Sequence, residues 1–337
     1  MMQRQVIIAV LLLGINLLER SFCFQQGLSI QCRRFQQVSS SSSTILKDGN
    51  IKEIYPDDDS LIDEILQVAI EASKAAGSII KENADGSSVV EKKSTSRDLL
   101  TEIDPKCEKA IRQTVVKRFP DHEFLGEEEV APGIEAAIAA LEKKLALPGW
   151  LWIVDPIDGT TNFSSGIPLN MPSIAVAYNG KVMVAVLNDP HRNELFTAVR
   201  GKGAFLNGQP IHVGEQEVLG DAVVGMESPA GEGSLQQCLQ GIGPLMPKVR
   251  TIRMLGSSAV FLPWVANGRL TAYWTPDECA WDIAAGALVV QEAGGKVTDI
   301  NGSDFNLRTR NIIASNGKVH EALLTVLREE ALLGPLV

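Results

Sequence analysis

The sequence predicts a layered α/β fold, in which β-sheets alternate with helices. Helical stripes and strand-length apolar runs alternate along most of the chain, a pattern typical of sheets with helices packed between them. The middle of the chain also carries Asn179-Gly180 and Asn207-Gly208, which are hairpin turn dipeptides. With 45% hydrophobic and 21% charged residues in a length of 337, the composition is that of an ordinary globular protein.

Helices dominate the first part of the predicted globular region. Apolar residues recur at spacings of three and four from Leu61 to Ile80, the stripe of a core-facing helix. Asp104-Pro105 marks a second helix, with Asp at the cap and Pro in the first turn, and this helix is expected to end near Pro120. A short third helix is predicted from Gly133 to Leu147.

Strands and helices alternate in the rest of the chain. Trp150 to Val154 is an apolar run of strand length that Asp155-Pro156 stops, so a carboxylate sits at the strand end. The hairpins of a meander follow. The remaining predicted elements are, in order, strand Val249 to Leu255, helix Ser257 to Ala266, strand Leu270 to Trp274, helix Trp281 to Ala293, and a strand and a helix that reach Glu330.

Residues 1–47 are predicted to be a targeting presequence. Val6 to Leu18 is an apolar run that is too short to span a bilayer, which needs about 20 residues, and it fits a signal peptide at residues 1–23. Residues 24–47 contain no acidic residue and a run of five serines, the composition of an organelle transit peptide. The two parts together resemble the bipartite presequences of algae with secondary plastids. We therefore expect the plastid stroma; secretion or an endomembrane lumen is the alternative.

The globular region, residues 48–337, is strongly acidic. The whole chain has a net charge of −10, and without residues 1–47 it has 26 basic and 40 acidic residues, a net charge of −14. Such a surface repels the phosphate backbone of nucleic acids, so a nucleic acid polymer is excluded as a partner. For an enzyme that acts on phosphate anions, this excess of carboxylates is a handicap unless some of them hold divalent cations.

The segment DPIDGTT, which begins at Asp155, carries the most chemical information. Pro156 forces Asp155 into an extended conformation, so its carboxylate projects from the strand end, and Asp158 follows in the turn. Most Asp-Pro and Asp-Gly pairs only cap turns, but a specified string of seven residues arises by chance about once in a million chains of this length. Backbone and hydroxyl groups for a phosphate are offered by Gly159, Thr160 and Thr161.

Four ordered motifs resemble the inositol monophosphatase family. They are DLLTEID from Asp98, LGEEE from Leu125, DPIDGTTNF from Asp155 and WDIAAGALVVQEAGG from Trp281. The resemblance covers roughly Leu61 to Leu327. It implies that residues 48–337 form the α-β-α-β-α sandwich that this family shares with fructose-1,6-bisphosphatase. It also implies a phosphoric monoester hydrolase that uses magnesium-activated water on a small phosphorylated metabolite.

The resemblance implies a centre with two to three Mg²⁺ ions. Glu127, Asp155 and the Ile157 carbonyl would hold one ion, while Asp155, Asp158 and Asp282 would hold a second. Carboxylate and carbonyl oxygens without His or Cys suit Mg²⁺. Chemistry gives an independent reason for metals, because the enzymatic acceleration of phosphomonoester hydrolysis approaches ~10²¹-fold. Side-chain acid–base catalysis supplies only about 10²- to 10⁴-fold, whereas paired metals activate water and neutralise the phosphate.

Three residues are expected to act in catalysis. The resemblance implies that Thr160 is positioned by Asp104 and that Glu127 orients or deprotonates the attacking water, which is bound to metal. Asp104 has an equally simple alternative as the N-cap of the helix that follows it. Asp282 likewise precedes a helix and would stabilise its N-terminus; capping and metal binding are compatible.

The residues expected to contact the substrate depart from the family pattern. Seven residues before Asp282, where the inositol-recognising pattern has glutamate, this chain has Thr275. Either Asp277 or Glu278 replaces the missing carboxylate from a different loop geometry, or the substrate is not an inositol phosphate. A turn that resembles the family's substrate-facing turn is the other expected contact, and its alternative is an ordinary helix cap. The expected substrate-binding residues are Gly159, Thr160, Thr161, Gly256, Ser257, Thr275 and Asp282.

The leading substrate is inositol monophosphate, because the motif spacing is nearest to that branch. Histidinol phosphate is second, and sugar phosphates and adenosine bisphosphate follow, since one fold serves all of these. A regulatory relative that binds phosphometabolites without hydrolysing them is the non-enzyme alternative. The resemblance also suggests a homodimer, and we expect no stable membrane insertion after processing.

Overall fold

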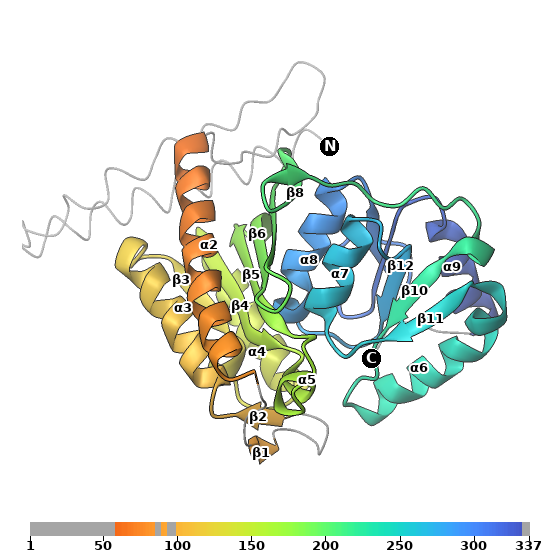
Figure 1. The fold of residues 1–337 in the computed structure, drawn as a ribbon, viewed down its shortest axis with the longest axis horizontal. Helices are drawn as coiled ribbons and strands as arrows, with labels where there is room; N and C mark the ends of the chain where they lie inside the picture. Colours follow the sequence, from red (N-terminus) through yellow and green to blue (C-terminus); the bar gives the residue numbers. More distant parts are fainter. Residues whose placement is uncertain (1–57, 85–88, 93–98, 332–337) are drawn as a thin grey trace, which may run out of the picture. The chain divides into compact units, whose positions relative to one another are not determined.

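The computed structural model describes residues 58–84, 89–92 and 99–331. The helices and sheets of these residues form five alternating layers (Figure 1). The predicted α-β-α-β-α sandwich is confirmed. The presequence predicted at residues 1–47 lies outside the described residues. No helix in the described part of the chain is long and apolar enough to cross a membrane.

The larger sheet has seven strands. In spatial order they are β3 (Glu123–Gly126), β4 (Trp150–Asp158), β5 (Met171–Tyr178), β6 (Lys181–Asp189), β7 (Glu194–Val199), β8 (Gly203–Leu206) and β9 (Gln209–Pro210). Only β3 and β4 pair in parallel; the other pairs in this sheet are antiparallel. Asn179-Gly180 joins β5 to β6 and Asn207-Gly208 joins β8 to β9, with positive φ at all four residues, which confirms the predicted hairpin turns.

The smaller sheet has five strands. In spatial order they are β11 (Thr251–Met254), β10 (Val223–Met226), β12 (Ala272–Thr275), β14 (Ile312–Ser315) and β13 (Lys296–Asp299). β10 runs parallel to β11 and β12, whereas β14 is antiparallel to both of its neighbours. A separate antiparallel pair is formed by β1 (Val89–Lys92) and β2 (Leu99–Thr101).

The helices form the other three layers. They are α2 (Asp59–Glu82), α3 (Asp104–Arg118), α4 (Ile134–Leu145), α5 (Thr160–Ser164), α6 (Glu232–Leu245), α7 (Ser258–Ala266), α8 (Ala280–Glu292) and α9 (His320–Thr325); the short 3₁₀ turns are η1 (Glu127–Glu129), η2 (Leu219–Asp221) and η3 (Met246–Lys248), and η4 (Val326–Glu330) is a π-helix. α2 and α3 pack together on the larger sheet, and α7 and α8 lie between the sheets. α6, α9 and η4 cover the outer face of the smaller sheet.

Helix α8 is buried nearly all round, because it has a sheet on each side. Its residues from Ile283 to Val290 are all buried, as expected for a helix that is apolar on every face. Gly286 lets α7 approach, since a Cβ at this position would overlap the side chain of Leu262. This close packing fixes the N-terminal turn of α8, where Asp282 lies.

The sequence predicts that this strand stops at Asp155-Pro156. In the structure β4 instead continues to Asp158. Its pairing with β5 is irregular here: Asp155 lies opposite Ser173 and Asp158 opposite Met171, so β4 has one extra residue. A proline has no N–H to donate and is accommodated at such a bulge. Both aspartates therefore belong to the end of one strand.

The sequence prediction missed β10 and α6. Helix α6 contains three glycines and Pro244, which lower its helix propensity. Its buried residues Ser234, Cys238, Gly241 and Leu245 nevertheless follow helical spacing. A Cβ at Gly241 would overlap the Trp274 ring, so the helix lies directly on the smaller sheet. Tertiary packing overrides local propensity in this segment.

His320, at the start of α9, predicts a pH dependence of stability. Its ring nitrogens lie 2.9 Å from the hydroxyls of Thr298 and Ser315. Burial, helped by the charge of Lys296, lowers the pKa of His320 from 6.5 to about 4. The unfolded chain therefore takes up a proton before the folded chain does, and stability is lost as pH falls from 6.5 through 4.

We expect this histidine to cost about 2 to 3 kcal/mol of unfolding free energy across that window. Urea unfolding of the wild type and of His320→Gln at neutral pH and near pH 4 measures the effect. The variant should lose less stability on acidification than the wild type does. An identical loss in both proteins would assign the pH dependence to other groups.

Candidate metal centre and active site

The parallel pair β3 and β4 brings two acidic segments to one edge of the larger sheet. Gly126, the last residue of β3, lies opposite Val154. The next residues along the two strands are Glu127 and Asp155, and the carboxyl ends of parallel strands meet at the same sheet edge. Glu127 begins η1, and its charge acts on both Asp158 and Asp282. The parallel register thus explains why LGEEE and DPIDGTT converge.

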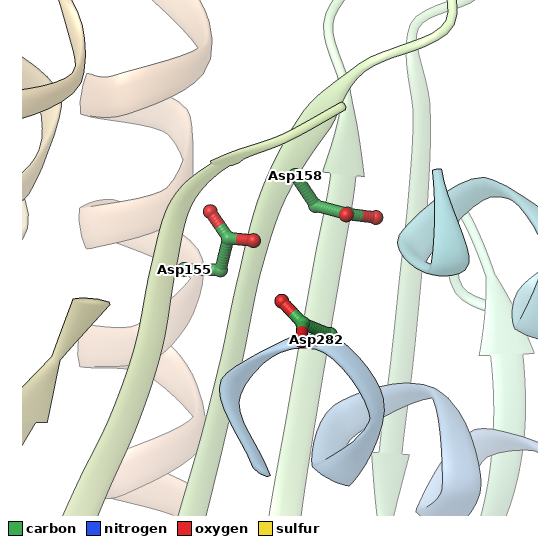
Figure 2. A group of neighbouring side chains, drawn as sticks. All are labelled: Asp155, Asp158 and Asp282. Atoms are coloured by element: carbon green, nitrogen blue, oxygen red, sulfur yellow. The ribbon is translucent and has the colours of Figure 1, made fainter. Parts of the chain in front are cut away.

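Three aspartates form a cluster that can hold a metal ion. Asp155 and Asp158 come from the end of β4, and Asp282 comes from the first turn of α8, as Figure 2 shows. One carboxylate oxygen of each lies within 4.8 Å of the others. The predicted metal ligands Asp155, Asp158 and Asp282 are therefore brought together from segments more than a hundred residues apart in the chain.

Backbone groups orient each of these carboxylates. Asp155 Oδ1 accepts a hydrogen bond of 2.8 Å from the Ile157 amide. Asp158 Oδ2 accepts one of 2.7 Å from Ser257 Oγ and another from the Ala259 amide at the start of α7. Asp282 Oδ2 accepts one of 2.7 Å from the Cys279 amide. Such contacts pre-orient ligands before a metal binds.

Neither Asp104 nor Asp282 is an N-cap, which was the alternative for both. The N-cap of α8 is Cys279, and Asp282 occupies the N3 position of a capping box, three residues after the N-cap. The N-cap of α3 is Ile103, which has no side-chain cap. Asp104 instead accepts hydrogen bonds from the amide of Thr101, at 2.9 Å, and from its hydroxyl.

Thr160 lies beside Asp104, as the family resemblance implies. Its hydroxyl is 3.2 Å from Asp104 Oδ1 and 3.1 Å from the Ile157 carbonyl oxygen. It can donate its one proton to either acceptor, and its lone pairs then face away from that acceptor. The Ile157 carbonyl, predicted as a metal ligand, is thus also an acceptor for Thr160. Thr161, the neighbouring residue, is exposed.

Glycines and Asn162 hold the DPIDGTT loop against the turn before α7. Gly159 has a φ of 90°, and a Cβ on it would lie 2.8 Å from the Leu169 carbonyl oxygen. Gly256 has a φ of 77°. Asn162 Nδ2 donates to the carbonyls of Leu169 (2.8 Å), Leu255 (2.6 Å) and Gly256 (3.2 Å). The sequence prediction missed Asn162, although it is the residue that follows DPIDGTT.

Glu108 supports the segment that carries Glu127 and Glu128. The sequence prediction missed this residue too. Its Oε2 accepts a 2.9 Å hydrogen bond from the Glu128 amide, and its carboxylate fills the space that a Cβ on Gly126 would need. Burial, together with the charges of Glu129 and Glu127, raises the pKa of Glu108 to about 7. Its position in α3, one helical turn after Asp104, is the sequence signal that could have identified it.

A cavity of about 410 Å³ opens beside the cluster and is lined by Glu127 and Asp282. Its lining also includes Ser234, Asp277 and Glu278. A cavity of this size can hold a small phosphorylated metabolite.

Asp277 and Glu278, the two candidate replacements for the missing family glutamate, both line the cavity. Thr275 is buried, and its hydroxyl donates a 3.2 Å hydrogen bond to Glu278 Oε1. Thr275 thus positions a carboxylate instead of supplying one. Asp277 pairs with Arg310. Ser257, expected to contact substrate, caps α7 by accepting from the Val260 amide and donates to Asp158.

Glu227, at the end of β10, adds a further buried carboxylate that the sequence prediction missed. Burial and the charges of Asp158 and Asp282 raise its pKa well above the usual value. Burial and neighbouring carboxylates likewise raise the pKa of Asp158, Asp282 and Glu278. Because like charges so close together are unfavourable, the arrangement is suited to cations, and its all-oxygen donor set fits Mg²⁺.

The layered fold and the acidic cluster beside a small cavity define a metal-dependent phosphoric monoester hydrolase. Residues 61–332 match the inositol monophosphatase family, and the chain belongs to this family. It is 41% identical to inositol monophosphatase 3 of Solanum lycopersicum over 271 residues, which cover 80% of this chain and 98% of the tomato protein.

Solved structures of relatives share the fold. The IMPase of Thermotoga maritima superposes with a TM-score of 0.71 at 33% sequence identity, over 80% of this chain and 98% of that one. An IMPase/NADP phosphatase complexed with Mg²⁺ and phosphate superposes with a TM-score of 0.68 at 25% identity, over 80% and 97%. The family resemblance predicted from the four sequence motifs is confirmed.

Proposed function

We propose that this chain hydrolyses inositol monophosphate to inositol and inorganic phosphate, with two to three Mg²⁺ ions. The observation that carries the proposal is the convergence of Asp155, Asp158 and Asp282 beside the Thr160–Asp104 pair. The similar tomato protein is named an inositol monophosphatase, and a similar solved structure holds Mg²⁺ and phosphate. Both support the proposal.

Different residues would bind the ions and orient the attacking water. Asp155, Asp158 and Asp282 would hold the ions, with Glu127 and the Ile157 carbonyl as further ligands. Bound Mg²⁺ supplies a Lewis acid for the phosphate oxygens and favours deprotonation of the attacking water. Asp104 fixes the Thr160 hydroxyl, whose remaining lone pair can accept a hydrogen bond from that water and align it with phosphorus.

The acidity of the site gives a reason for more than one ion. Glu127, Asp155, Asp158 and Asp282 together bring up to four negative charges, and the substrate phosphate brings more. A single divalent cation leaves most of this charge uncompensated. Two or three ions balance it, which agrees with the slowness of the uncatalysed reaction and the acceleration it demands.

Removal of the Thr160 hydroxyl tests the assignment. We expect Thr160→Val to lower kcat for phosphate release from inositol 1-phosphate by about 10²-fold, because the water loses its orienting partner. The matched control is Thr325→Val, the same change at an exposed position of α9, which should leave kcat unchanged.

Phosphate release is measured with Mg²⁺ and with a chelator. Wild-type protein that releases no phosphate from inositol, histidinol, sugar or nucleotide phosphates in the presence of Mg²⁺ would contradict the proposed function and favour a binding role. Unchanged kcat in Thr160→Val, with an active wild type, would contradict only the part assigned to Thr160.

We also propose the plastid stroma as the location and a homodimer as the assembly. The composition of residues 1–47 supports the first, and the family resemblance supports the second. A fluorescent fusion of residues 1–60 in a plastid-bearing cell tests the location, and sedimentation of the purified protein tests the assembly.

A further inference from the structure

Helix α3 carries three charged residues on the side that faces the active site. Asp104, Glu108 and Arg112 are spaced by four residues, so they stand on successive turns of the same face. Asp104 lies 3.2 Å from the Thr160 hydroxyl, and Glu108 accepts a 2.9 Å hydrogen bond from the Glu128 amide. The proposed reaction uses Asp104 through Thr160 but gives Arg112 no role.

Arg112 contacts the segment that carries Glu127 on both sides of that residue. Its guanidinium forms an ion pair with Glu129, the last residue of η1. Its Cζ also lies 4.0 Å from the centroid of the Phe124 ring in β3, which is a cation–π contact. Phe124 is buried and lies opposite Trp152 in the larger sheet. Arg112 thus joins η1 to a strand that the sheet holds firmly.

The η1 turn needs a cation, because it consists of three consecutive carboxylates, Glu127, Glu128 and Glu129. Like charges so close together repel one another and favour an opened turn. Glu108 brings a fourth carboxylate to the same turn. Arg112 supplies positive charge here, since it pairs with Glu129 and its charge also acts on Glu108. It therefore offsets part of the repulsion that would open η1.

The two contacts of Arg112 support each other. An exposed ion pair alone contributes little, since two long side chains must be held in one geometry. The Arg112 side chain is only 33% exposed, and the Phe124 ring fixes the plane of its guanidinium. A guanidinium can stack on a ring while its N–H groups point to a carboxylate, whereas the ammonium of a lysine is a flexible point charge.

We propose that Arg112 is a positioning residue that holds η1 in place and thereby sets the affinity of the metal centre for Mg²⁺ through Glu127. This inference rests on the metal centre of the proposed function. Replacing groups that orient metal ligands costs about 10- to 100-fold in metal affinity. Arg112 acts one contact further out and does not line the cavity, so its replacement should weaken Mg²⁺ binding and leave the chemical step nearly unchanged.

The sign of the effect separates this role from a simple charge effect. Mg²⁺ is a cation, so removal of the nearby positive charge of Arg112 would strengthen Mg²⁺ binding if Coulomb repulsion alone acted. If Arg112 holds η1 in place, the same removal weakens binding. Arg112→Lys keeps the charge and loses the planar guanidinium, so the charge effect predicts no change and the positioning role predicts weaker binding.

The measurement is the apparent dissociation constant of Mg²⁺ for the purified protein, determined by calorimetry, with kcat at saturating Mg²⁺ beside it. We expect the constant to rise about tenfold in Arg112→Ala and about threefold or more in Arg112→Lys, with kcat at saturation within about twofold of the wild type.

Arg118→Lys is the matched control in the same helix. The contacts of Arg118 among the described residues are an ion pair with Glu64 and the face of the Phe119 ring, neither of which belongs to η1. The control makes the same chemical change to the same kind of paired and stacked arginine. It should leave the Mg²⁺ dissociation constant unchanged.

Glu129→Gln tests the same ion pair from its exposed side, where the substitution leaves the core untouched. It should also raise the Mg²⁺ dissociation constant. Because the two residues act as one unit, Arg112→Ala combined with Glu129→Gln should bind Mg²⁺ about as weakly as Arg112→Ala does. Two independent charge effects would instead cancel and return the double variant to the wild-type constant.

Mg²⁺ binding in Arg112→Ala or Arg112→Lys that is as tight as in the wild type, or tighter, would overturn the proposal. So would an equal weakening in Arg118→Lys. Both results leave the phosphatase in place if the wild type still releases phosphate from inositol 1-phosphate with Mg²⁺. A wild type that neither binds Mg²⁺ nor releases phosphate contradicts the proposed function instead, and the role of Arg112 with it.

Discussion

Asp155→Asn lowers kcat for phosphate release by about a thousandfold or more, the largest loss that we expect from a single change. Replacing residues that merely support a metal ligand already costs about 10- to 100-fold. Asp155 is expected to bridge two ions, and an amide cannot supply the charge that holds them. Its oxygen can still accept the bond that the Ile157 amide donates to Asp155 Oδ1, so the loop should keep its shape.

The measurement is kcat as a function of Mg²⁺ concentration, with thermal unfolding of the metal-free protein beside it. Asp121→Asn is the matched control, because it makes the same chemical change at an exposed position. We expect the control to behave as the wild type does. An Asp155→Asn protein that keeps more than about a tenth of wild-type kcat at any Mg²⁺ concentration would refute the bridging assignment.

Gly159→Ala should be the most damaging small substitution in the loop. Gly159 has a φ of 90°, and an added Cβ would lie 2.8 Å from the Leu169 carbonyl oxygen and 3.1 Å from that of Gly256. The left-handed conformation alone costs an alanine about 1 to 2 kcal/mol. The overlap with backbone adds to that cost, so we expect about 3 kcal/mol or more in total.

Gly294→Ala isolates the contribution of that overlap. Gly294 has a φ of 87°, lies on the surface, and has nothing within 4 Å of the added Cβ. Both variants pay the same conformational cost, so the difference between their unfolding free energies in urea measures the clash. Gly159→Ala should also lower phosphate release, whereas Gly294→Ala should not. Equal destabilisation of the two variants would mean that the loop shifts to accommodate the added Cβ without a cost in free energy.

The sequence predicted the layered fold and the members of the aspartate cluster because both depend on local signals. The stripe from Leu61 to Ile80 and the Asn-Gly turns are patterns that a few neighbouring residues determine. The carboxylates of Asp155 and Asp158 stand in one contiguous motif. Asp282 was identified by a second motif, and the family resemblance alone connected the two.

The positions of Glu278 and Glu227 were not predictable in the same way. Glu278 reaches the cavity because Asp277 adopts a left-handed conformation, which depends on Arg310 and Asn311, more than thirty residues later in the chain. Glu227 follows a strand that the prediction missed, so its place at a strand end went unnoticed. Both carboxylates owe their positions to contacts between distant segments, which periodicity does not reveal.

The hydrogen bonds between the DPIDGTT loop and the start of α7 have a consequence for biosynthesis. Asp158 is oriented by an amide 101 residues later, and Asn162 by a carbonyl 93 residues later. A growing chain therefore carries Asp158 well before the groups that orient it, at the start of α7, have been synthesised. Because a domain generally folds as a unit during synthesis, we expect catalytic competence to appear late and abruptly, once α8 has emerged.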